Sequence, residues 1–303
     1  VCGSTLPQLV KMGWLPRAPA LALAALRWGE LGVQVASSAP SSPSSPRSRR
    51  LRARRRERRR RLGLNSTDEY EAELSDALEE AWLAYGTDRA AWGHGYGPAY
   101  ARLFARALQR PPRRLLEIGI GHERGARAHT PARAGGAGLR AWRDVFPEVD
   151  LVGYDIHPRT MLVDEERIRT YLCDATSGAG SGEQQSDGAG CPSWQADSAF
   201  DVIVDDASHD VGSQLDTFDH VYKFLRPGGY HVIEDVLTMS LPIFQPLVSA
   251  GIATWNNTNS PNVFNGNLDD SNILIIQKVG EVSDDEEMQR WLHWAKGTLD
   301  VGA

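Results

Sequence analysis

Six short apolar runs, with helical stretches between them, constrain the fold of this chain more than any other feature. Several runs are apolar at every position instead of at alternate ones, which is typical of strands covered on both faces by helices. The pattern predicts an α/β protein with a Rossmann-like, doubly wound and mostly parallel sheet that carries helices on both faces. The runs are 113–121, 149–156, 167–175, 200–209, 228–236 and 272–280, and we expect the last to form an edge strand.

Two helices are expected before the first of these runs. Apolar positions recur at helical spacing behind a candidate N-cap at 65–67, and an acidic first turn supports a helix from there to about residue 85. A second helix is expected over 97–109, because the double proline at 111–112 cannot continue it.

The first 64 residues differ in composition from the rest. They contain a Ser/Pro-rich tract at 37–46 and an Arg-rich run at 47–61, with no hydrophobic period that could build a core. We therefore expect 1–64 to be disordered and 65–303 to form one domain, with a flexible Gly/Ser-rich insertion at 176–190. The Arg-rich segment fits an organellar transit peptide, a nucleic-acid or nuclear-import tail, or a general preference for arginine, so the localisation stays open.

Charge and hydrophobicity exclude several classes of protein. The net charge is −6, and residues 1–64 carry 14 Lys and Arg against 2 Asp and Glu, so the remainder carries −18. An acidic body argues against nucleic acid as a partner, because phosphates need a concentrated basic surface. With 41% hydrophobic and 24% charged residues the chain has a soluble, globular composition, and its longest apolar stretch, 18–26, is too short to cross a bilayer.

The cysteines offer no sign of a disulfide framework. There are three of them, Cys2, Cys173 and Cys191, and none stands in a CxxC pair. An odd number without that spacing argues against both a disulfide scaffold and a thiolate metal site. We expect Cys173 to be a small residue of the core.

Acidic residues and a glycine turn close the first three strand-like runs. The first run ends in Glu117-Ile-Gly119-Ile-Gly121, the second in Asp155 and the third in Asp174. Ligands of parallel sheets bind beyond the carboxyl ends of the strands, so these residues are expected to share one rim. The glycines let a ligand approach the backbone, and Asp155 and Asp174 are placed for a ribose and an adenine edge.

The glycine turn departs from the dinucleotide-binding fingerprint. GxGxxG would need glycine at position 124, which is Arg124, and the third glycine is displaced to Gly125. An NAD-dependent oxidoreductase is therefore disfavoured.

A second group of polar residues follows the fourth and fifth strand-like runs. Asp206 closes one run, and Glu234 and Asp235 close its neighbour, so the three carboxylates can converge on a hard divalent ion, for which magnesium is the best candidate. His209, three residues beyond Asp206, is the candidate general base for a hydroxyl that the ion acidifies. The alternative is that Asp205 or Asp206 caps the next helix while His209 faces solvent. Mutual repulsion of the carboxylates favours the cation.

These motifs, in this order, resemble the class I S-adenosylmethionine-dependent methyltransferases. The resemblance implies that Glu117 and the glycines contact the methionine end of the cofactor, Asp155 the ribose and Asp174 the adenine. Further segments narrow it to the metal-dependent macrolide sugar O-methyltransferases of the mycinamicin type. They are "YGTDRAAWGHGYGPAYARLF" (85–104), "LLEIGIG" (115–121), "GGAGLRAWRDVFP" (135–147), "VDDASHD" (204–210) and "VIEDV" (232–236).

The narrower resemblance implies metal ligands at Asp206, Glu234 and Asp235 and a base at His209, in agreement with the strand ends. It also implies that the segment carrying Tyr85, Thr87 and Asp88 lies over the cofactor. Two departures stand out: relatives commonly have serine where this chain has Gly138, and the insertion 176–190 borders the adenine region. His94 and Tyr96 lie in a Gly-rich loop that is either part of a lid or plain surface.

The sequence thus predicts an O-methyltransferase that uses S-adenosylmethionine and Mg²⁺ on a hydroxyl of a sugar or another small molecule. Two other hypotheses remain open. One is a non-catalytic cofactor-binding module whose Arg-rich segment docks to an acidic partner, and the other is a cephalosporin hydroxylase-like enzyme of the same fold. No membrane partner is expected, and a homo-oligomer is compatible with the sequence.

Overall fold

The computed structural model describes residues 67–121, 135–177, 191–192, 194, 196, 199–257, 270–280 and 282–300. All of them belong to one compact unit, Ser45–Ala303. The predicted disorder of 1–64 lies outside the described residues, as do most of the insertion at 176–190 and the first two positions of the candidate N-cap.

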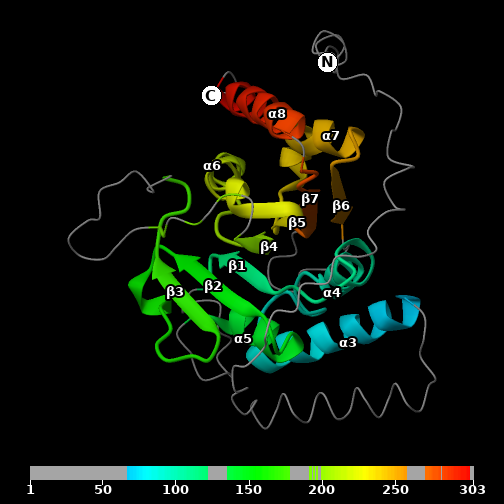
Figure 1. Ribbon diagram of the computed structural model, residues 1–303, viewed down its shortest axis with the longest axis vertical. Coiled ribbons are helices and arrows are strands. Elements are labelled where there is room, and N and C mark those ends of the chain that lie inside the picture. Colours follow the sequence, from blue (N-terminus) through cyan, green and yellow to red (C-terminus); the bar gives the residue numbers. More distant parts are fainter. Residues whose placement is uncertain are drawn as a thin grey trace, which may run out of the picture. The chain divides into compact units, whose positions relative to one another are not determined.

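A seven-stranded sheet in the order β3-β2-β1-β4-β5-β7-β6 forms the middle layer (Figure 1). The five strands from β3 to β5 are parallel, whereas β7 runs antiparallel to both of its neighbours. The predicted doubly wound, mostly parallel sheet is therefore confirmed. The strands are β1 (Arg114–Ile118), β2 (Asp150–Asp155), β3 (Ile168–Leu172), β4 (Phe200–Asp205), β5 (Leu225–Ile233), β6 (Ala253–Asn257) and β7 (Asn272–Gln277).

The prediction of an edge strand over 272–280 is wrong. β7 lies between β5 and β6, and β6 is the edge. The first five residues of β7 are buried, which agrees with an interior position, while Thr254 and Trp255 of β6 are exposed. β6 escaped prediction because its sequence, Ala-Thr-Trp-Asn-Asn, is polar and short.

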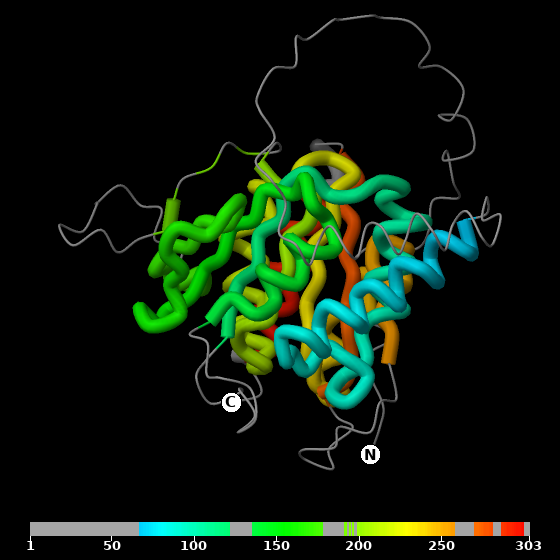
Figure 2. Tube along the Cα trace, turned by 90° about the horizontal axis from the view of Figure 1, so that it is seen from below, coloured from blue at the N-terminus to red at the C-terminus, as the bar shows by residue number. Residues whose placement is uncertain are grey.

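Helices cover both faces of the sheet, as Figures 1 and 2 show. α3, α4 and α5 lie on one face, where α3 packs against both of the others. α6, α7 and α8 lie on the other, where Phe218 of α6 contacts His231 of β5 and Trp291 of α8. The helices are α3 (Thr67–Tyr85), α4 (Gly97–Arg102), which continues as the π-helical turn η1 (Leu103–Ala107), α5 (Ala137–Val145), α6 (Val211–Val221), α7 (Leu241–Ser249) and α8 (Val282–Asp300). Both helices expected before the first strand are thus present. Single turns of 3₁₀-helix occur at η2 (Pro158–Thr160), η3 (Tyr222–Phe224) and η4 (Thr238–Ser240).

An aromatic cluster joins the helices of the first face. Trp142 of α5 makes edge-to-face contacts with Trp82 and Tyr100, and Phe104 packs in the same way against Trp142 and Phe146. Such pairs contribute about 0.5–1.5 kcal/mol each beyond the burial of their area. The cluster fixes α4, and with it the 86–96 loop, over the sheet.

Cys173 and Cys191 form a disulfide with a Cα–Cα distance of 4.7 Å. The expectation that the cysteines carry no such bond is therefore wrong for this pair, although Cys173 is buried as expected. The count of cysteines could not reveal the bond, because it depends on how the chain returns from β3 to the start of β4. Among the described helices, none combines the length and apolar character that a bilayer crossing needs.

Candidate functional site

The carboxyl ends of the parallel strands open into a pocket of about 830 Å³. Its wall contains every residue predicted for the site except Glu234. Those wall residues are Tyr85, Thr87, Glu117, Gly119, Gly121, Asp155, Asp174, Asp206, His209 and Asp235. The topology accounts for this, because parallel strands present all their carboxyl ends to the same rim.

The glycine turn after β1 lies between the end of β2 and the residues that follow β4, and contacts both. Gly119 has φ +79°, and a Cβ there would lie 2.2 Å from the carbonyl oxygen of Asp206, so glycine is needed both for the conformation and for the close approach. Asp155 holds the other side of the turn, accepting hydrogen bonds from the backbone N–H of Ile120 (3.1 Å) and of His157 (2.8 Å). The turn is therefore preformed.

Glu117 lies at the floor of this end of the pocket, with 1% of its surface exposed. Its Oε2 accepts a hydrogen bond from the indole N–H of Trp142 (2.9 Å), and its Oε1 contacts Nη1 of Arg89 (3.1 Å). Two donors thus fix the carboxylate in one orientation.

The remaining residues predicted to contact the cofactor have varied surroundings. The Tyr85 hydroxyl donates to Asp144 (2.9 Å), whereas the buried Thr87 Oγ1 has no hydrogen-bond partner within the described part of the chain. Asp174 is exposed and accepts hydrogen bonds from the backbone N–H and the hydroxyl of Thr176. Thr87 and Asp174 can therefore accept a ligand without losing a tertiary contact.

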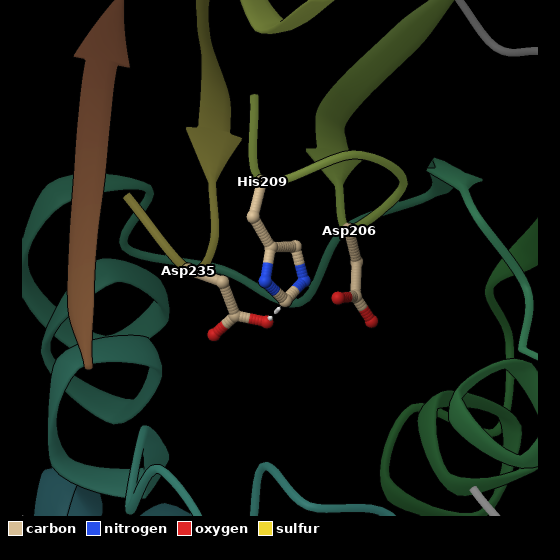
Figure 3. Close-up of side chains that lie close together, drawn as sticks. All are labelled: Asp206, His209 and Asp235. Atoms are coloured by element: carbon tan, nitrogen blue, oxygen red, sulfur yellow. Dashed lines mark ion pairs between the residues drawn. The ribbon is translucent and has the colours of Figure 1, made fainter. Parts of the chain in front are cut away.

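Asp206, His209 and Asp235 form the second group in the pocket (Figure 3). One ligand atom from each lies within 4.8 Å of the other two, and Nε2 of His209 is 3.1 Å from Oδ2 of Asp235. Asp206 follows β4, Asp235 follows β5, and His209 lies on the turn from β4 into α6. Asp235 has φ +52°, a left-handed conformation that Asp adopts more readily than most residues.

The second oxygen of Asp235 is held from the opposite side. Its Oδ1 accepts a hydrogen bond from the Tyr96 hydroxyl (2.6 Å) and lies 3.3 Å from Nδ1 of His94. The hydrogen bond with Asp235 raises the pKa of His209. Burial would raise the pKa of Asp235, but hydrogen bonding and charge from His209 and His94 outweigh it and lower that pKa. His94 and Tyr96 are 5% and 1% exposed and both contact Asp235, so the alternative of a plain surface loop is wrong.

Glu234 is not part of this group and pairs with Arg89. The Arg89 Nε–H donates to both of its oxygens (2.9 and 2.7 Å), and the Tyr100 hydroxyl donates to Oε1 (2.6 Å). Burial raises the pKa of Glu234 to about 7, an effect that Arg89 opposes and the charge of Asp235 reinforces.

Arg89 is the residue that sequence reasoning missed. It is 2% exposed and contacts three carboxylates, those of Glu117, Asp206 and Glu234. No spacing rule singles out one arginine of a loop in a chain that holds 33 Lys and Arg. Gly138 makes room for it, since a Cβ there would lie 2.3 Å from Nη1 of Arg89 and 2.2 Å from Oε1 of Glu117. The space that a serine would need is thus filled.

The alternative in which Asp205 or Asp206 caps the helix is wrong, although its other part, a solvent-exposed His209, agrees with a side chain that is 46% exposed. The N-cap of α6 is Asp210, whose side chain accepts a hydrogen bond from the backbone N–H of Ser213 (2.9 Å). Asp205 is instead buried beneath the rim, and burial raises its pKa to about 7.

The donor set fits a hard divalent ion. The carboxylates of Asp206 and Asp235 converge beside His209, and carboxylate oxygens are the ligands that a hard ion prefers. The crowding of acids there is unfavourable without added positive charge. Burial also raises the pKa of Asp206 well above its usual range, opposed by Arg89 alone among the main causes. A cation among these side chains would relieve that cost.

The strand order with an antiparallel β7 agrees with the class I methyltransferase fold that the resemblance implies. No protein-family model matches the chain. Similar curated proteins are O-methyltransferases. The 8-demethyl-8-(2-methoxy-alpha-L-rhamnosyl)-tetracenomycin-C 3'-O-methyltransferase of Streptomyces olivaceus is 35% identical over 153 residues, covering 50% of this chain and 35% of that protein.

Mycinamicin VI 2''-O-methyltransferase of Micromonospora griseorubida is 32% identical over 167 residues, which are 55% of this chain and 38% of that protein. The chain thus spans little more than a third of the length of these curated relatives. A solved structure of the MycE methyltransferase in complex with Mg, S-adenosylhomocysteine and mycinamycin VI is 26% identical, with a TM-score of 0.39 over 56% of this chain and 40% of that one. The sequence comparisons confirm the predicted resemblance to sugar O-methyltransferases.

Proposed function

We propose that this protein is an S-adenosylmethionine- and Mg²⁺-dependent O-methyltransferase whose acceptor is a sugar hydroxyl of a small-molecule glycoside. The observation that supports this most is that a single pocket holds the glycine turn with its strand-end acids next to the group Asp206, His209 and Asp235. Cofactor and acceptor would then meet inside one pocket, which is what a direct transfer needs.

The cofactor would occupy the β1–β3 end of the pocket. Glu117 and the glycine turn would hold the methionine end, Asp155 the ribose hydroxyls, and Asp174 the adenine. Tyr85 and Thr87 would close over it, and the unpartnered Thr87 Oγ1 supplies a hydrogen-bonding group there. These roles are the ones that the resemblance implies.

A divalent ion would be held by Asp206 and Asp235, with Glu234 as a further ligand. When bound, such an ion orients a coordinated acceptor hydroxyl and lowers its pKa. Hydroxyl oxygens of the acceptor and water would complete the coordination, as Mg²⁺ commonly keeps several non-protein ligands.

His209 is the proposed base. Because its Nε2 faces Asp235, the neutral ring carries its proton there, and Nδ1 is the nitrogen that can accept another. The acceptor oxygen forms a bond to the methyl carbon as the bond from carbon to sulfur breaks. The proton of the hydroxyl passes to His209, and the sulfonium leaves as the neutral thioether S-adenosylhomocysteine.

Calorimetry on the full chain tests the two halves of the site. The variant Asp235→Asn removes a ligand charge with a residue that tolerates the same left-handed backbone. Asp164→Asn is the matched control, since Asp164 also has a positive φ (+54°) and is exposed outside the pocket. We expect all three proteins to bind S-adenosylhomocysteine and only Asp235→Asn to lose the Mg²⁺ signal. A folded wild-type protein that binds no cofactor would overturn the proposal.

The acceptor class requires a second assay. The Streptomyces olivaceus relative acts, by its name, on a rhamnosyl compound, so a panel of glycosides and their aglycones should be offered with methyl-labelled cofactor. We expect label in the glycosides alone. Equal labelling of the aglycones would move the acceptor hydroxyl off the sugar.

A further inference from the structure

The guanidinium of Arg89 bridges the ends of three adjacent strands. Nη1 lies 3.1 Å from Glu117 at the end of β1, Nη2 lies 2.7 Å from Asp206 after β4, and Nε and Nη2 both contact Glu234 after β5. Its side chain is 3% exposed, and those of Glu117 and Glu234 are 2% and 1% exposed. The guanidinium therefore supplies positive charge to the cluster of the three carboxylates of Glu117, Asp206 and Glu234.

A divalent ion and Arg89 would draw on the same two carboxylates. Glu234 gives both of its oxygens to Arg89, and Asp206 gives Oδ2 to it, yet these two residues belong to the proposed ligand set. A carboxylate that already accepts a charge-assisted hydrogen bond has less negative charge to offer to an ion. Removing the guanidinium would leave buried carboxylates unpaired, which is strongly unfavourable until another cation arrives.

We propose that Arg89 is a positioning residue that stands in for the metal in the ion-free protein and competes with it for Glu234 and Asp206. The ion draws these carboxylates away from the guanidinium, which stays anchored to Glu117. Gly138, which leaves space at Nη1, allows this anchoring. The inference rests on the proposed divalent site. Beyond that function, we infer that the Arg89 guanidinium lowers the affinity of the site for the ion.

The test compares Mn²⁺ binding by calorimetry in three versions of the 303-residue chain: wild type, Arg89→Met and Arg89→Lys. A unit charge within about 4–6 Å commonly changes the proton affinity of a carboxylate by about tenfold or more, so we expect Mn²⁺ to bind Arg89→Met at least about tenfold more tightly. Arg89→Lys keeps the charge but not the planar fork, so its Mn²⁺ affinity should lie between those of wild type and Arg89→Met. The matched control is Arg110→Met, which removes an arginine from Asp201 at the opposite ends of the strands and should leave Mn²⁺ affinity unchanged.

A second readout does not depend on the Met variant. The arginine Nε–H signal that disappears from the NMR spectrum of Arg89→Lys reports the hydrogen bond to Glu234 in wild-type protein. We expect Mg²⁺ to shift this signal with the same midpoint as its binding curve.

Each failure has a distinct meaning. Mn²⁺ binding by wild type with no gain in folded Arg89→Met, or an Nε–H signal that Mg²⁺ saturation leaves in place, overturns this inference alone. Wild-type protein that binds S-adenosylhomocysteine but no Mn²⁺ overturns it together with the metal part of the proposed function, and leaves the cofactor part standing.

Discussion

At the scale of single residues, Asp235 carries two separate tasks on its two oxygens. Oδ1 is held by Tyr96 and faces His94, which leaves Oδ2 directed at His209. The imidazole is therefore oriented by a carboxylate that is itself fixed before any ligand binds. Preformed orientation of this kind reduces the reorganisation that a proton transfer requires.

Replacing the proposed base separates its role from binding. In His209→Ala we expect kcat to fall by about 10²–10⁴, the range for loss of a general base, while the Kd for S-adenosylmethionine changes little. The control is His293→Ala on the exposed side of α8. Methyl transfer with labelled cofactor and calorimetry measure the two quantities. An unchanged kcat would remove His209 from the mechanism.

A methyl group at position 138 should disturb Arg89 and Glu117 together. A Cβ there meets both side chains at 2.2–2.3 Å, and neither has free space because both are buried. We expect Gly138→Ala to cost about 1–3 kcal/mol of stability, as for other overpacked sites. Gly297→Ala is the control, since that helical glycine has open space around it and its replacement should stabilise by about 0.5–1 kcal/mol. Urea unfolding followed by circular dichroism measures both changes, and equal effects would contradict the crowding.

At the scale of elements, Asp201 ties the starting ends of the central strands. Its carboxylate, on β4, accepts hydrogen bonds from the backbone N–H groups of Arg113 and Arg114 before and within β1 (2.6 and 2.9 Å). Arg110 and Arg226 contact its other oxygen. Burial would raise the pKa of Asp201, but these four donors together lower it.

This network predicts a pH-dependent contribution to stability. A folded-state pKa below the unfolded value of about 3.9 stabilises the protein above that pH, and the contribution is lost as the pH falls through the folded pKa. We expect Asp201→Asn to lower the free energy of unfolding by about 3 kcal/mol at pH 7. The difference from wild type should shrink below about pH 4. Urea titrations at pH 7 and pH 3.5 measure it, and a difference that does not change with pH would contradict the assignment to the charge.

Strands were predictable from sequence to the extent that burial marks them. The continuous apolar runs identified β1 to β5 and β7, because an interior parallel strand has no polar face. β6 has a polar face, and because this edge strand is short and polar its sequence resembles that of a loop. The position of β7 inside the sheet could not be derived without knowing that β6 lies beyond it.

At the scale of the whole molecule, the site was predictable wherever topology alone places residues. Acids at the ends of parallel strands must share a rim, so Glu117, Asp155 and Asp206 could be placed together in the sequence. Arg89 comes from a loop whose position depends on how α4 and the aromatic cluster pack, and no local pattern encodes that. The pairing of Glu234 with Arg89 depends on the same packing, so the sequence could not reveal it either.

The disulfide between Cys173 and Cys191 can be checked by counting reactive thiols. Of the three cysteines, only Cys2 should react with a thiol reagent in denatured, unreduced protein. All three should react after reduction. Closing a loop of this size commonly contributes about 3 kcal/mol, so Cys191→Ser should unfold at lower urea concentration than wild type. Cys2→Ser serves as the control. Three reactive thiols without reductant would contradict the bond.

The π-helical turn after α4 has a consequence for insertions and deletions. A π-turn holds one residue more than an α-helical turn does, and the helix that begins at α4 ends on this wider turn, Leu103–Ala107, before the chain reaches β1. Removing a single residue there would return the turn to α-helical width and leave one residue less between α4 and β1. Tyr96 and Tyr100, whose hydroxyls hold Asp235 and Glu234, lie on one side, and the entry to β1 lies on the other. The length of this one turn therefore sets the spacing between these two tyrosines and β1. Substitutions of side chains alone do not change that spacing.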